Sequence, residues 1–280
     1  MTRVIDLHVH TTASDGTYSP ADVVKLAGKA GLAAVAITDH DTVDGVEEAL
    51  KASDGMSLEV VPGVEISVGD TDNIHIIGLY VNMFEENFKN LMDKLKASRN
   101  ERNHAIIENI RNEGYDISCE KVKESMKAEN IGRLHIAHYL QKRGYFSDYR
   151  KAFKKFLIPE SKTYVPIKHV SEEEGIQAII KSGGLPFLAH INYLKMSDFE
   201  IEKTVKRLID TGLAGIEVFY SGYNKKTEAF AHRLCDKYDL LKSGGTDFHG
   251  ARRPGVYLGT GRGNLMVPHK FLLDIKKKLG

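Results

Sequence analysis

The chain has 280 residues, a formal net charge of +1, and ordinary proportions of apolar (42%) and charged (28%) residues. This length is enough for one large domain, or for one domain that carries a sizeable insertion. The near-neutral charge argues against nonspecific binding to duplex DNA, and no apolar run is long enough to cross a membrane, so we expect neither partner.

Cysteine usage and the start of the chain bear on its location. Cys119 and Cys235 form no pair motif, so a disulfide framework is not expected. The first residues enter a strand pattern directly, without the apolar segment of a signal peptide. These features predict a cytoplasmic protein.

Short apolar runs alternate with helical patterns along most of the chain. Strands are predicted at 4–9, 33–39, 58–67, 74–81, 185–190, 214–220 and 240–248. Helices are predicted at 20–31, 43–53, 171–182, 198–211 and 224–238. Ser19-Pro20 and the pair Ser171 and Glu174 are typical of helix N-termini. Near-continuous apolar strands separated by helices predict an α/β fold with a parallel sheet, either open or closed into a barrel.

The stretch 85–163 differs from the rest of the chain. It has no convincing strand, is rich in Lys, Glu and Asn, and carries apolar residues at helical spacing, as in Phe88, Leu91 and Leu95. We therefore predict a helical insertion domain at 85–163, which divides the main domain into 1–84 and 164–280.

Nine side chains with metal-binding groups stand in short motifs that follow or lie within these apolar runs. They are His8, His10, Asp15, His40, Glu65, His75, His190, Asp247 and His249. Imidazole and carboxylate ligands suit Zn, Mn and Fe. Nine groups are too many for one tetrahedral ion but enough for two or three divalent ions that share a carboxylate. We therefore expect a multinuclear metal centre of the kind that hydrolyses phosphate esters.

The placement of the candidates supports a common site. Six polar side chains lie at or near the C-terminal end of a predicted strand, and in a parallel barrel these ends meet on one face. They are His8, Asp39, His40, Glu65, His190 and Asp247.

The individual signals differ in strength. His8 and His10 share one face of a strand, but many His-x-His pairs bind nothing, and Asp15 alone resembles an ordinary turn residue. Glu65 follows the apolar run VVPGV, where a carboxylate needs a cation, so it is the best bridging candidate. For His75, a hydrogen-bonded strand histidine and a metal ligand are equally good interpretations. The remaining histidines are interpreted as structural or surface residues: His104, His138, His169, His232 and His269.

Charge and one further motif point to an anionic substrate. Three carboxylates facing three divalent cations would leave about three positive charges, which a phosphate ester would neutralise. In "GRLHIAHYL", Arg133 and His135 stand at the start of a predicted helix, a position that favours anions. Composition alone slightly favours an ordinary amphipathic helix for this segment.

The ordered motifs DLHVHTTASDG, ITDHDT, PGVEIS, HIIG, GRLHIA, AHI and GGTDFHG resemble the PHP (polymerase and histidinol phosphatase) family over essentially the whole chain. The resemblance implies a distorted seven-stranded (β/α) TIM-like barrel with a trinuclear metal site. It implies a first ion held by His8, His10, Glu65 and Asp247. A second ion would be held by Glu65, His75 and His190, and a third by Asp15, His40 and His249.

The resemblance also implies an activity. A hydroxide on the ion held by His8, His10, Glu65 and Asp247 would attack phosphorus, with Mn, Zn or Fe as the metal. Asp15 and the insertion are similar to the branch that includes 3′,5′-nucleoside bisphosphate phosphatases and enzymes that trim short oligoribonucleotides. In that branch the positions of Arg133 and His135 hold substrate phosphate. The expected partner is thus a small phosphorylated nucleotide or a short single-stranded RNA. The alternatives are a histidinol-phosphate-type monoesterase and a noncatalytic, metal-stabilised module.

Overall fold

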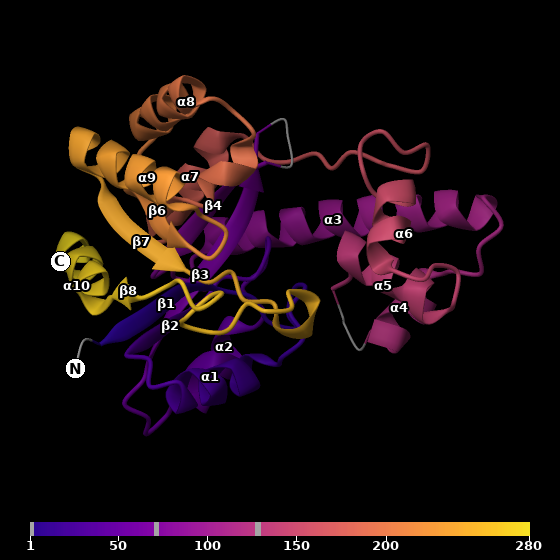
Figure 1. Ribbon diagram of the computed structural model, residues 1–280, viewed down its shortest axis with the longest axis horizontal. Coiled ribbons are helices and arrows are strands. Elements are labelled where there is room, and N and C mark those ends of the chain that lie inside the picture. Colours follow the sequence, from indigo (N-terminus) through magenta and orange to yellow (C-terminus); the bar gives the residue numbers. More distant parts are fainter. Residues whose placement is uncertain (1–2, 70–72, 127–129) are drawn as a thin grey trace.

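The computed structural model of the chain describes residues 3–69, 73–126 and 130–280. Its strands form one eight-stranded sheet in the order β7-β6-β5-β4-β3-β2-β1-β8 (Figure 1). The strands are β1 (Val4–Val9), β2 (Ala34–Ile37), β3 (Glu59–Val68), β4 (Ile74–Leu79), β5 (Leu185–Leu188), β6 (Gly215–Tyr220), β7 (Leu241–Gly245) and β8 (Val267–Pro268). All seven predicted strands are present, and β8 is a short addition that the sequence pattern did not reveal.

The helices follow the predicted order outside the insertion. They are α1 (Pro20–Lys29), α2 (Val46–Ala52), α7 (Glu172–Lys181), α8 (Asp198–Asp210), α9 (Lys225–Tyr238) and α10 (His269–Leu279), of which α10 was not predicted. The Ser19 side chain caps α1 by accepting a hydrogen bond from the Asp22 N–H, and Ser171 and Glu174 form the expected capping box of α7. Figure 1 shows α1 and α2 on one side of the strands and α7, α8 and α9 on the other.

The sheet is mixed, so the prediction of a parallel sheet was wrong for β4, and the additional strand β8 is antiparallel as well. β4 pairs antiparallel with both β3 and β5, and β8 pairs antiparallel with β1. The cause is the short connection between β3 and β4, because a parallel neighbour needs a long crossover, usually a helix. The reversal places the beginning of β4, and not its end, at the edge where the parallel strands finish.

Contacts between β1 and the segment after β7 nearly close the sheet into a barrel. Val9 forms a parallel bridge with Phe248, and the Asp247 N–H donates to the His8 carbonyl at 2.8 Å. Gly245 permits this approach, since a Cβ at that position would lie 2.4 Å from the His8 Cβ. The barrel-like α/β architecture that the sequence predicted is thus confirmed.

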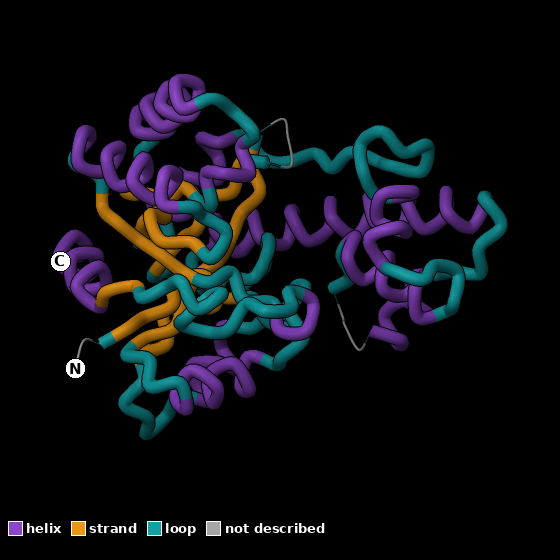
Figure 2. Tube along the Cα trace, viewed as in Figure 1, coloured by secondary structure: helices purple, strands orange, loops and turns teal. Residues whose placement is uncertain are grey.

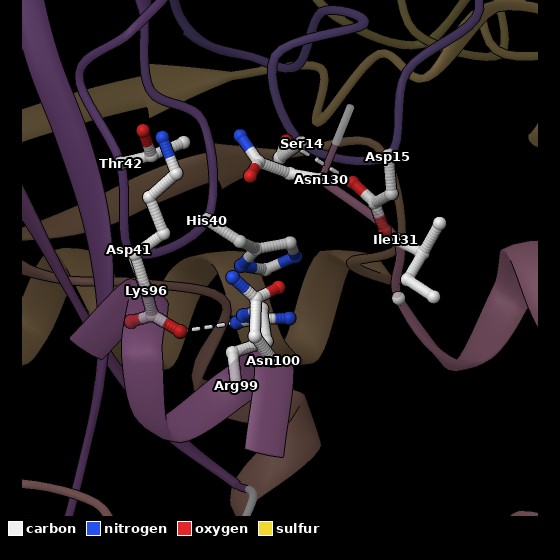
Figure 3. A pocket seen from close by; sticks show the side chains of 11 residues that line it. Ser14, Asp15, His40, Asp41, Thr42, Lys96, Arg99, Asn100, Asn130 and Ile131 are labelled. Carbon is white, nitrogen blue, oxygen red and sulfur yellow. Dashed lines mark hydrogen bonds and ion pairs between the residues drawn. The ribbon is translucent and has the colours of Figure 1, made fainter. Parts of the chain in front are cut away.

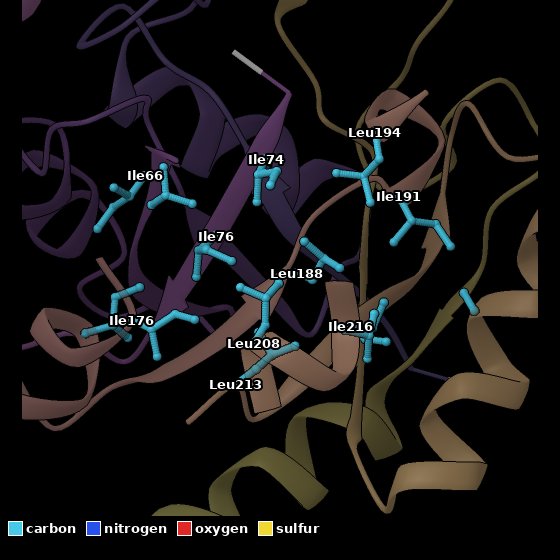
Figure 4. Close-up of a cluster of buried hydrophobic side chains, with 14 of the residues drawn as sticks. Ile66, Ile74, Ile76, Ile176, Leu188, Ile191, Leu194, Leu208, Leu213 and Ile216 are labelled. Carbon is cyan, nitrogen blue, oxygen red and sulfur yellow. The ribbon is translucent and has the colours of Figure 1, made fainter. Parts of the chain in front are cut away.

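The largest apolar cluster fills the space between β3–β6 and the helices α7, α8 and α9. Figure 4 shows its side chains converging from strands and helices, among them Ile66, Ile76, Leu188 and Ile216. This packing fixes the strand ends that carry the polar candidates.

The described residues of the insertion form four helices: α3 (Glu86–Asn112), α4 (Cys119–Met126), α5 (Arg133–Lys142) and α6 (Tyr149–Phe156). They extend away from the barrel (Figure 2). The first half of α3 packs into the barrel cluster through Phe88, Met92 and Leu95, whereas Ile106 and Ile110 belong to a separate core with α5 and α6. The boundary between barrel domain and insertion domain at residue 85 stays a prediction, because α3 packs in the cores of both.

Over the described part of the chain, no helix is both long enough and apolar enough to span a membrane.

We expect Phe88→Ala to lower the free energy of unfolding by about 3–5 kcal/mol, because it removes a fully buried ring where α3 joins the barrel core. Phe84→Ala is the matched control, since Phe84 lies four residues earlier and is 76% exposed. Urea denaturation of both variants measures the difference. Equal midpoints would show that α3 is not anchored at this position.

Candidate metal centre

The structure brings all nine candidate side chains together at one edge of the barrel. Four overlapping groups, whose possible ligand atoms lie within 4.8 Å of one another, include every one of them. His8 and Glu65 lie in β1 and β3, and most of the others lie in the loops that follow strands. His75 joins them because it is the second residue of the reversed strand β4, a position that sequence reasoning could not assign.

The Glu65 carboxylate lies at the centre of the cluster and is fully buried. Its Oε1 lies 2.8 Å from His75 Nδ1 and 2.7 Å from His190 Nε2. Its Oε2 lies 3.3, 3.2 and 3.0 Å from ring nitrogens of His8, His10 and His40. Each oxygen thus faces a different set of imidazoles, which is the arrangement that a bridging carboxylate requires.

The loop residues complete the cluster on the other side of His10. Asp15 Oδ1 lies 3.1 Å from His249 Nε2, and the rings of His10 and His249 stack with centroids 4.1 Å apart. Asp247 Oδ1 lies 3.2 Å from His10 Nε2.

The chemistry of these groups fits divalent cations. Glu65 Oε2 and the Nδ1 atoms of His10, His40 and His190 are buried without a hydrogen-bond partner among the described residues. Buried polar atoms normally have partners, and imidazole nitrogens and carboxylate oxygens without one are suitable ligands for Zn, Mn or Fe.

Without a bound metal, protons on histidine rings balance the negative charges of the carboxylates in this cluster. Burial favours the neutral imidazole of His10, but Asp247 and Glu65 raise its pKa to about 10. Burial would likewise raise the pKa of Glu65, yet His40, His75 and His8 hold it well below its usual range. The centre therefore holds imidazolium and carboxylate groups side by side.

The backbone at two of the candidates is in the left-handed region, which is uncommon for residues other than glycine. His190 has φ 22° and Asp247 has φ 55°. Such conformations cost roughly 1–3 kcal/mol each and persist only where the surroundings enforce them. Here the two strained residues are ones whose side chains point into the cluster.

Three residues support the cluster from outside it: Asp39, which the sequence placed among the strand-end candidates, and Arg253 and Tyr220, which the sequence analysis missed. Asp39 was placed among the strand-end candidates, but its carboxylate accepts hydrogen bonds from Thr11 N, Thr11 Oγ1 and Ser14 Oγ at 2.5–2.7 Å, which holds the loop before Asp15. Arg253 forms an ion pair with the outer oxygen of Asp247, and the Tyr220 hydroxyl donates to the same oxygen at 2.9 Å. Although burial opposes it, Arg253 and His8 keep the pKa of Asp247 well below its usual range.

A cavity of about 610 Å³ opens over the cluster and extends to the insertion. At one end it is lined by Asp15, His40, His75 and His190. Three arginines line it from the insertion: Arg99, Arg102 and Arg133. The aromatic rings of Phe153 and Tyr193 also line this cavity.

The two predicted phosphate contacts differ in position. Arg133 is the first residue of α5 and lines the cavity, with its guanidinium 5.8 Å from the centre of the Phe153 ring. His135 is 1% exposed, and its Nδ1 accepts the Gly132 N–H at 2.8 Å, so its ring caps α5. Burial lowers the pKa of His135 to about 3, which keeps the ring neutral. His135 does not line the cavity, and its contact with substrate stays a prediction.

A second, smaller cavity lies between the barrel loops and the insertion. Figure 3 shows Ser14, Asp15 and His40 of the barrel facing Lys96 and Arg99 of α3. Arg99 forms an ion pair with Asp41, the residue after His40, and Lys96 pairs with Asp44 at 2.6 Å. These contacts fix the insertion directly over the metal-ligand candidates.

A barrel that gathers imidazole and carboxylate groups at its strand ends, beneath a cavity lined by arginines, has the architecture of a metal-dependent hydrolase. The PHP domain model matches residues 6–214, and the chain belongs to the PHP family.

The chain is similar to two named relatives and to a solved structure. It is 31% identical to a 5′-3′ exoribonuclease of Haemophilus influenzae, over 89% of this chain and 91% of that protein. It is 30% identical to a 3′,5′-nucleoside bisphosphate phosphatase of Chromobacterium violaceum, over 91% and 90% of the two chains. A crystal structure from Bifidobacterium adolescentis, assigned as a metal-dependent phosphoesterase, superposes with a TM-score of 0.87 at 29% identity and covers 99% of this chain and 96% of that one.

Metal loading should release protons. The raised pKa of His10 means that its imidazolium is populated at neutral pH, and a cation must displace that proton, so metal affinity should fall as the pH is lowered. Titration of the metal-free protein with Zn²⁺ in two buffers of different ionisation enthalpy should show about one or more protons released. His104→Gln, at an exposed histidine of α3, should behave like the parent protein. A binding heat independent of buffer would contradict this charge balance.

Glu65→Gln should remove most metal binding and phosphoesterase activity while the protein stays folded. An amide bridges two cations poorly, and changes behind a ligand already cost roughly 10- to 100-fold, so the loss should reach at least about 100-fold. Glu59→Gln is the control on the same strand, because the Glu59 carboxylate bonds Tyr80 and Lys276 away from the cluster. Near-normal turnover of Glu65→Gln at saturating Mn²⁺ would rule out the bridging role.

Proposed function

We propose that this protein is a metal-dependent phosphoesterase that hydrolyses phosphate esters of small nucleotides, either 3′,5′-nucleoside bisphosphates or short oligoribonucleotides. The observation that carries the proposal is one cavity whose lining includes both Arg133 and four of the nine clustered side chains, Asp15, His40, His75 and His190. One end of this cavity suits a scissile phosphate on cations, and the other suits a second phosphate.

The proposed cofactors are two or three divalent ions, Mn, Zn or Fe, held by the nine side chains. Glu65 would be shared between the sets that contain His8 and His190, as its two oxygens already face those sets. Bound divalent ions neutralise phosphate charge and activate water for attack at phosphorus.

The protein's own groups position the substrate and the ligands. Arg253 and Tyr220 hold the outer oxygen of Asp247, so that its other oxygen faces the cluster. Arg133 would bind the remote phosphate through its planar guanidinium, and Arg99 and Arg102 lie in the same cavity. His135 would act by holding the start of α5 in place.

Two features support nucleotides over a histidinol-phosphate-type monoester. The cavity volume of about 610 Å³ can hold a nucleotide, and its lining includes Arg133 of the insertion, which would bind a second phosphate that a small monoester lacks. The complete set of nine side chains also favours an enzyme over a noncatalytic module. We further propose a cytoplasmic location, which two free cysteines fit.

A hydrolysis panel tests the activity. Adenosine 3′,5′-bisphosphate, a 5′-phosphorylated trinucleotide RNA, histidinol phosphate and a nitrophenyl phosphate are each assayed with Mn²⁺, Zn²⁺ or Fe²⁺. Preference for the first two substrates is expected. Preference for histidinol phosphate would support the alternative enzyme, and no turnover with any metal would support the noncatalytic module.

Arg133→Ala should lower kcat/KM for a nucleoside bisphosphate by about 10- to 100-fold. A charge-assisted contact of this kind is worth roughly 1.5–3 kcal/mol, and Arg133→Lys should recover only part of it. Hydrolysis of nitrophenyl phosphate, which has no second phosphate, should change much less.

Arg150→Ala is the matched control, because Arg150 lies on the exposed surface of α6 and pairs with Asp148. If Arg133→Ala reduces turnover of both substrates equally, Arg133 acts at the scissile phosphate or in folding. If neither substrate is affected, the insertion does not recognise phosphate through this residue.

A further inference from the structure

Glu217 is a fully buried carboxylate of β6 that lies directly behind the candidate metal centre. It is not one of the nine candidate ligands. Its Oε1 lies 3.0 Å from His8 Nδ1, and its Oε2 accepts a hydrogen bond from the His190 N–H at 2.8 Å. One side chain thus contacts two candidate ligands that come from β1 and from the loop after β5.

The contact with His8 determines which ring nitrogen faces the cluster. Nε2 of His8 lies 3.1 Å from His10 Nε2 and 3.3 Å from Glu65 Oε2, on the opposite side of the ring from Glu217. A neutral imidazole has one N–H and one lone pair. Because a carboxylate can only accept, Glu217 requires the proton at Nδ1 and leaves the lone pair of Nε2 directed into the cluster.

The contact with His190 holds a strained backbone. His190 has φ 22°, and its N–H is fixed by Glu217. The Tyr223 hydroxyl reinforces the same turn, since it accepts the Ile191 N–H at 2.8 Å and donates to the Glu217 carbonyl at 3.1 Å. The side chain and backbone of Glu217 therefore brace both residues of the His190–Ile191 turn.

We propose that Glu217 is a positioning residue of the metal centre, which sets the tautomer of His8 and holds the His190 turn, and thereby controls the affinity for the ion at His8. The inference rests on the proposed metal-dependent function. Residues behind a metal ligand typically change metal affinity by about 10- to 100-fold, a magnitude that direct measurement resolves.

Glu217→Gln tests the role with almost no change in shape. A carboxamide has one acceptor oxygen and one NH₂ donor, so it cannot accept from both His8 Nδ1–H and the His190 N–H. The Zn²⁺ concentration for half-occupancy of one ion should rise about 10- to 100-fold in competition with a chelator. An ion held by Asp15, His40 and His249, which Glu217 does not contact, should be much less affected.

Ser243→Ala is the matched control for disturbance of the barrel. Ser243 is the register partner of Glu217 on β7, is 1% exposed, and its Oγ has no hydrogen-bond partner among the described residues. Its loss should leave zinc binding unchanged. Thermal unfolding of the metal-free proteins shows whether each variant is folded before metal is added.

A spectroscopic readout separates positioning from a general loss of packing. In the zinc-loaded protein with ¹⁵N-labelled histidine, the His8 Nδ1–H should give a proton resonance, assigned by its absence in His8→Gln. That resonance should be lost or shifted in Glu217→Gln and unchanged in Ser243→Ala.

The outcomes distinguish this inference from the function on which it rests. If the parent protein binds no metal, the proposed function fails first. If it binds metal and Glu217→Gln binds it equally well, or Ser243→Ala loses as much, only the role of Glu217 is overturned. Glu217→Asp, which keeps the charge but withdraws the oxygens by one methylene, should weaken binding in the same direction. If neither Glu217 variant folds without metal, Glu217 is a structural residue and the inference fails.

Discussion

The arrangement of this protein depends on one buried carboxylate surrounded by imidazoles. Glu65 is fully buried, and five histidines place ring nitrogens within 3.3 Å of its oxygens. Such a group is tolerated only when positive charge surrounds it. The strands that meet at this point must therefore deliver their histidines to the same place, and the barrel-like curvature of the sheet does so.

A second layer of polar residues makes this delivery rigid. Asp39 anchors the loop that leads to Asp15, and Arg253 holds the outer oxygen of Asp247. Asp6, also buried, accepts hydrogen bonds from Thr246 and from the Gly259 N–H, and so ties the segment before Asp247 to β1. In each case a polar side chain outside the nine candidates fixes either a candidate ligand or the loop that carries one. The barrel end is thus held by directional bonds where apolar packing alone would leave the loops free to move.

Much of this was readable in the sequence, because strands and ligand motifs are local. Apolar runs of period-two or continuous character located seven strands, and the motifs around His8, Glu65 and Asp247 located the cluster. The antiparallel direction of β4 was missed, although the short connection between the predicted strands 58–67 and 74–81 already indicated it. The reason why His75, near the start of β4, joins the cluster was missed for the same reason. Tyr220 and Glu217 were missed because their contacts join residues far apart in sequence. Arg253 lies only six residues after Asp247, but no motif marked it as a partner of that carboxylate. α10 and β8 were missed because no motif drew attention to the last residues.

The long helix α3 belongs to two cores at once, and this has a consequence for how specificity can change. Its first turns are locked by the barrel cluster through Phe88, Met92 and Leu95, and its later turns by the insertion's own core. The residues that form the far wall of the cavity are thus supported by a core that, among the described residues, shares no buried side chain with the core beneath the metal-ligand candidates. Substitutions in that distal core can reshape the wall and alter which phosphorylated molecule fits, while the chemistry at the barrel end is left intact. The two properties can diverge separately in evolution, and each is open to separate redesign.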